Sequence, residues 1–150
     1  MIRNHRFHAI CALVVAVAFA GLPGCGSSQT DDYKKEAQKA GNDFKASAEA
    51  ASKQVQAAPD KAGKLKGLDA LKASVNDAAT DFSKLDPPDK AKAANDQLVT
   101  ELRALAGDVD SVKKALETSD AEAAKAAIPR LQADQARIGT TIADLESKLK

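Results

Sequence analysis

The residue types that carry most enzyme chemistry are missing from nearly all of this chain. It has no tryptophan, and its two histidines, its two cysteines and its one methionine all lie within the first 25 residues. From residue 26 onward there is therefore no imidazole, no thiol and no His/Cys metal site. The glycines are scattered and form no phosphate-binding loop. We expect a protein that is not an enzyme and that holds no metal or cofactor.

An excess of charge of one sign is also missing. Two of the 22 basic residues, Arg3 and Arg6, precede residue 25, which leaves 20 basic against 21 acidic residues and a net charge of −1. This balance argues against a nucleic-acid partner. The carboxylates Asp108 and Asp110 are two residues apart on an expected helix, so we expect them to point to different faces rather than to form a catalytic pair.

The first 24 residues have the order of a secretory signal peptide. A basic start is followed by an apolar run from Ala9 to Ala20, which is too short for a membrane span of about 20 residues. The run ends before Leu22-Pro23-Gly24-Cys25. This motif resembles the lipoprotein box of bacterial lipoproteins at three of its four positions, and Pro23 departs from it.

The resemblance implies cleavage between Gly24 and Cys25 and acylation of Cys25. Residues 1–24 would then be the signal peptide, and residues 25–30 the lipidated cysteine and a flexible tether. The protein would be lipid-anchored in the cell membrane or the outer membrane and would face the extracytoplasmic side. Acyl chains on one cysteine give firm attachment. Secretion with a free Cys25 thiol and a retained membrane anchor are the alternatives.

Residues 31–150 are expected to form an all-α domain. Apolar residues recur at helical spacing throughout this part of the chain, and no stretch alternates between apolar and polar residues as a strand would. Prolines and capping residues divide this part into similar lengths joined by short connections, which favours an antiparallel up-down bundle of three to four long helices. A capping box is expected at Ser119-Asp120-Ala121-Glu122. The expected helices span residues 31–58, 60–85, 88–117 and 120–149.

The apolar stripes differ in strength among these helices. The third helix has a heptad seam. The first has only Tyr33, Phe44 and Val55, eleven residues apart with alanines between them, so we expect it to be weakly packed. Gly67 is expected to weaken the second helix. Pro129 is expected to kink or break the fourth. The seam of the third helix is made by Leu98, Leu102, Leu105, Val109, Val112 and Leu116.

These features predict a non-catalytic helical bundle that binds an envelope protein or has a structural role. The alanine-rich body also loosely resembles small uncharacterised helical lipoproteins, a resemblance that implies no mechanism. Two alternatives stay open. The terminal Lys150 is similar to the residue through which some outer-membrane lipoproteins are joined to peptidoglycan, which would make the bundle a covalent tether. A groove with Tyr33, Phe44 and Phe82 could instead carry an apolar ligand.

Overall fold

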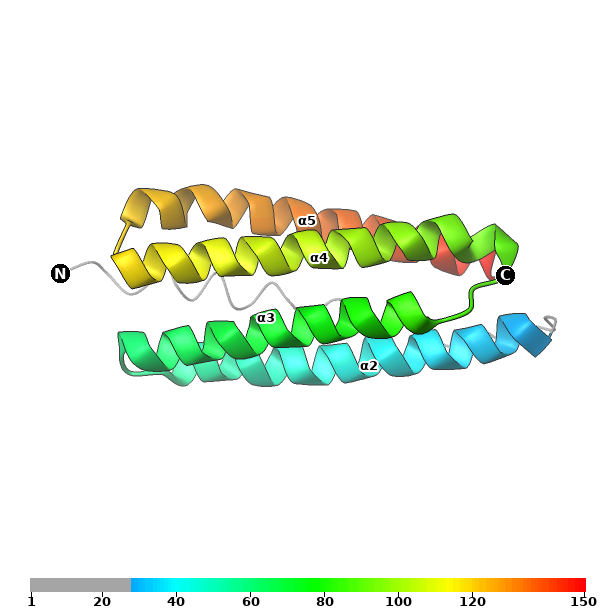
Figure 1. Cartoon of the computed structure of the whole chain (residues 1–150), viewed down its shortest axis with the longest axis horizontal. Coiled ribbons are helices and arrows are strands. Elements are labelled where there is room, and N and C mark those ends of the chain that lie inside the picture. Colours follow the sequence, from blue (N-terminus) through cyan, green and yellow to red (C-terminus); the bar gives the residue numbers. More distant parts are fainter. Residues whose placement is uncertain (1–27) are drawn as a thin grey trace.

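The protein, described by a computed structural model over residues 28–150, folds in that range into four α-helices without strands. Each helix runs antiparallel to the one before it (Figure 1). The all-α up-down bundle predicted from the sequence is therefore confirmed. The helices are α2 (Ser28–Ala57), α3 (Lys61–Lys84), α4 (Asp89–Thr118) and α5 (Ala121–Lys148).

Each described helix packs extensively only on its neighbours in the chain. The three large interfaces are α2 with α3, α3 with α4, and α4 with α5. Helices α2 and α5 lie on the outside of this series. The start of α2, the turn between α3 and α4, and the carboxyl terminus lie at one end of the bundle, here named the terminal end (Figure 1). The two other turns lie at the far end, about 45 Å away for helices of this length.

The far end is held together by side chains from both of its turns. Lys61 Nζ donates to the Glu117 carbonyl oxygen at 2.6 Å and to Ser119 Oγ at 3.2 Å. The Asp60 side chain caps α3 by accepting from Gly63 N at 2.8 Å. The turn between α2 and α3 is therefore fixed against the turn between α4 and α5.

The helix boundaries differ from the expected ones in two informative places. Residues 28–30, which were expected to lie in the tether, are helical and belong to α2, which the structure describes from Ser28. The expected capping box is also wrong in its first residue. Asp120 is the N-cap of α5 and accepts from Ala123 N at 2.9 Å. Ser119 instead ends α4 in the left-handed conformation, with φ 57°.

Ser119→Gly is expected to stabilise the fold by about 0.5–1 kcal/mol, because a side chain at positive φ is strained and glycine is not. The hydroxyl contact with Lys61 is lost, but that lysine keeps the Glu117 carbonyl. Thermal unfolding followed by circular dichroism measures the change. Ser119→Ala is the control, and it should gain nothing, since alanine keeps the strain.

The first helix does not show the weak packing expected from its few large side chains. Tyr33 and Phe44 are only 1% and 5% exposed. A Cβ atom on Gly67 of α3 would lie 2.9 Å from the backbone nitrogen of Val55 in α2. The two helices thus approach to backbone contact, because the residues between them are small. Buried small residues of α2 are Ala37, Ala40, Gly41, Ala48, Ala51 and Ser52.

The most thinly packed helical segment is instead the amino-terminal half of α5. Between residues 121 and 133 only Ala127 is buried, and Ile128 and Leu131 are half-buried. The helix continues through Pro129 without the break that was one of the expected outcomes. The carboxyl-terminal half of α5 is packed more tightly, since Ile138, Ile142 and Leu145 are buried.

Candidate functional site

The terminal end of the bundle brings together the first described helix, a central turn and the carboxyl terminus. Gln29 Nε2 donates to Asp86 Oδ2 at 3.2 Å, which places the start of α2 beside the turn between α3 and α4. Leu149 is 2% exposed, and Lys150 after it is exposed. The carboxyl terminus is therefore held on the bundle by Leu149 and lies at the same end of the bundle as this turn (Figure 1).

The predicted lipidation and cleavage residues, Cys25 and Gly24, lie outside the described residues. Cys25 is three residues before Ser28 in the chain. Three residues span at most about 11 Å.

A buried polar network joins three helices at this end. The Tyr33 hydroxyl of α2 donates to Asn95 Oδ1 of α4 at 2.9 Å. Asn95 Nδ2 in turn donates to the Phe82 carbonyl oxygen of α3 at 3.1 Å. Burial raises the pKa of Tyr33 well above its ordinary value, so the phenol stays neutral and remains a donor. The network fixes the position of α2 against α3 and α4.

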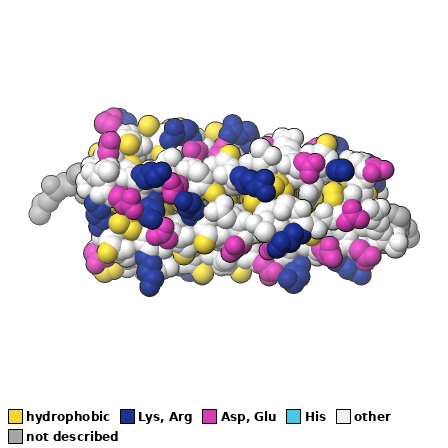
Figure 2. Space-filling view, viewed as in Figure 1, with side chains coloured by type: hydrophobic (Ala, Val, Ile, Leu, Met, Phe, Trp, Pro, Cys, Tyr) yellow, Lys and Arg dark blue, Asp and Glu magenta, His cyan; other side chains and the backbone are white. Residues whose placement is uncertain are grey.

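Ion pairs cross the interface between α3 and α4. Lys72 Nζ lies 2.6 Å from Asp110 Oδ1, and Lys113 Nζ lies 2.6 Å from Asp69 Oδ1. Hydrogen bonds from Lys114 and Lys72 lower the pKa of Asp110 to about 2. Basic and acidic side chains are interspersed over the face shown in Figure 2. This pattern is typical of solvated helix surfaces.

The carboxylates Asp108 and Asp110 point to different faces of α4, as predicted. Asp110 faces Lys72 of α3, whereas Asp108 Oδ1 lies 3.5 Å from Arg130 Nε of α5. The structure adds a residue that sequence reasoning missed. Asp134 of α5 is only 3% exposed and is paired with Arg137 of the same helix, and burial together with the Asp134 carboxylate raises the pKa of Asp108. Asp134 lies three residues after Leu131 and four before Ile138. This helical spacing was the signal in the sequence that could have predicted its burial.

Within residues 28–150 no three or more His, Cys, Asp or Glu side chains are grouped so that they could hold a metal ion. None of the helices described in that range is long and apolar enough to cross a membrane. Comparisons with protein-family models, with curated proteins and with solved structures found no match. The functional proposal therefore rests on the motif around Cys25 and on the arrangement of the bundle.

Proposed function

We propose that this protein is a membrane-anchored extracytoplasmic lipoprotein whose non-catalytic helical bundle binds another envelope protein or has a structural role in the envelope. One observation carries the proposal. The motif Leu22-Pro23-Gly24-Cys25 stands three residues ahead of a helical bundle, after a basic start and an apolar run. Acyl chains on Cys25 would hold the bundle at the membrane by its terminal end.

The arrangement of the helices supports display away from the membrane. With an even number of antiparallel helices in residues 28–150, the start of α2 and the carboxyl terminus lie at the same end (Figure 1). The far end, with its linked turns at Lys61 and Ser119, would then be held about 45 Å from the anchor. A bundle attached in this way presents its long faces and its far end to other envelope components.

The two alternatives are less well supported by the same geometry. A tether to the wall through Lys150 would have both attachment points at the terminal end, so the length of the bundle would bridge nothing. A carrier for an apolar ligand would need accessible aromatic surface. Tyr33, Phe44 and Phe82 are 1%, 5% and 2% exposed, and their rings belong to the core.

The test is the intact mass of the protein released from native membranes after muramidase digestion. We expect a chain that begins at an acylated Cys25 and ends at an unmodified Lys150. A muropeptide on Lys150 would instead support the wall tether, and a chain without acyl mass would overturn the membrane anchor. Deletion of Lys150 is the matched control, and it should leave membrane attachment unchanged.

A further inference from the structure

The first turns of α5, residues 121–128, are held by few contacts. Ala127 is the one buried residue among them, Ala124 and Ile128 are half-buried, and the others are exposed. Within residues 28–150 the only helix on which α5 packs extensively is α4. Little therefore opposes the unwinding of these turns.

Pro129 separates these turns from the rest of α5. It has no N–H group, so the Lys125 carbonyl oxygen receives no helix bond from it, and its ring crowds that oxygen. The helix is nevertheless continuous through this position. Proline is well suited to the first turn of a helix, where the N–H group has no helix partner in any case. Helix α5 therefore has two possible starts, the one at Ala121 that Asp120 caps and a second one at Pro129.

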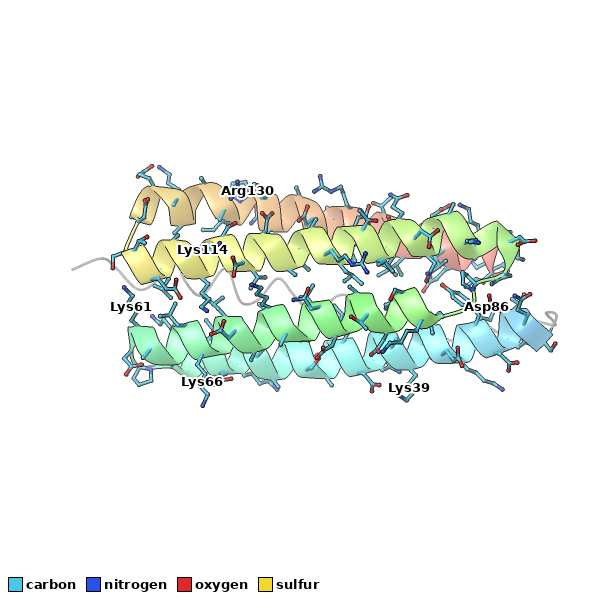
Figure 3. The ribbon with its side chains drawn as sticks, in the orientation of Figure 1. Lys39, Lys61, Lys66, Asp86, Lys114 and Arg130 are labelled. Atoms are coloured by element: carbon cyan, nitrogen blue, oxygen red, sulfur yellow. The ribbon has the colours of Figure 1, made fainter. Side chains whose placement is uncertain are left out.

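Both ends of this segment are fixed by contacts outside it. Before the segment, Lys61 of α3 holds the end of α4 by donating to Ser119 Oγ at 3.2 Å. After the segment, Arg130 Nε lies 3.5 Å from Asp108 Oδ1 of α4 (Figure 3). Leu131 also packs against the core there. The segment can therefore unwind while the parts of the chain on either side of it stay in place.

We propose that α5 has a second start at Pro129, and that residues 121–128 unwind as a unit while the rest of the bundle stays folded. Segments with few buried contacts open at a lower free energy than the core of a protein. The boundary lies at Pro129 because one helix bond is missing across it, and because this residue can begin the shortened helix.

The unwound state uncovers a buried flank of α4. Asp108 and Ala115 are seven residues apart, which is about two helical turns, so both lie on the flank that faces Arg130. Ala115 is only 4% exposed, and unwinding exposes it at the far end of the bundle. If the bundle is anchored as proposed, this end is the one farthest from the membrane, but the unwinding itself does not depend on the anchor.

The test is hydrogen exchange of the full-length protein in detergent micelles, at urea concentrations below the unfolding transition. We expect the amides of residues 124–128 to exchange at least about tenfold faster than those of residues 138–145. Their rates should scarcely depend on urea, because the opening exposes little surface. The same protection and the same urea dependence in both segments would overturn the proposal.

Pro129→Ala tests the position of the boundary. Alanine restores the bond to the Lys125 carbonyl oxygen and removes the crowding, so the exchange of residues 124–128 should become slower by about tenfold or more. Gly139→Ala is the matched control, because an added Cβ atom there has no atom within 4 Å and the change lies beyond the boundary. It should leave the exchange of residues 124–128 unchanged. Unchanged exchange in Pro129→Ala would contradict the second start.

Discussion

Gly67→Ala is expected to destabilise the bundle by about 1–3 kcal/mol, the usual cost of forcing an extra carbon into a packed interface. A Cβ atom at this position would lie 2.5 Å from Val55 Cγ2, 2.9 Å from Val55 N and 3.1 Å from Val55 Cα. The side-chain contact could be relieved by rotation, but the backbone contacts could not. Helix α2 would have to move away from α3, and the small buried residues along it would lose their contacts.

The chain offers a control for the effect of alanine itself. Gly107 of α4 has no atom within 4 Å of an added Cβ. Gly107→Ala should therefore raise stability by about 0.5–1 kcal/mol, because alanine is the better helix former. Thermal and urea unfolding of both variants measure the two changes. Equal gains at Gly67 and Gly107 would contradict the close approach of α2 to α3.

Gly67→Ala is expected to lower stability and Gly107→Ala to raise it, and this difference shows the limit of what the sequence could predict. Periodicity, capping residues and prolines predict four helices and their order, because each signal lies within one helix or one turn. From such signals Gly67 can be predicted only to weaken the helix that contains it. The distance between α2 and α3 depends on small residues of both helices together, and so the sequence led to the wrong expectation for α2.

The same limit applies to the polar residues between helices. The divergence of Asp108 and Asp110 follows from helix geometry alone and was predicted. The contact of Asp108 with Arg130 depends on how α4 and α5 are aligned along their lengths. Asp134 is 3% exposed, whereas the next residue along α5, Gln135, is only half-buried. A periodic pattern gives the apolar face of each helix, but it does not give this alignment.

The Tyr33 network joins α2 to α3 and α4, and Tyr33→Phe tests its contribution to stability. Loss of the hydroxyl leaves the buried Asn95 Oδ1 without the donor at 2.9 Å. An unsatisfied buried polar group costs about 1–3 kcal/mol. We expect a loss of that size in urea unfolding, with an unchanged content of helix. Gln38→Ala, on the same helix but at an exposed position, is the control and should have a much smaller effect.

A double-mutant cycle separates the hydrogen bond from the packing of the ring. Asn95→Leu removes the other partner and leaves the Tyr33 hydroxyl unpaired, so it should also be destabilising. In the double variant no polar group of this pair remains, and the loss should be smaller than the sum of the two single losses by about 0.5–3 kcal/mol. Additive losses would mean that the hydroxyl and the amide act independently. Coupling of the expected size would establish that the buried hydrogen bond between Tyr33 and Asn95 helps to hold α2 against the rest of the bundle.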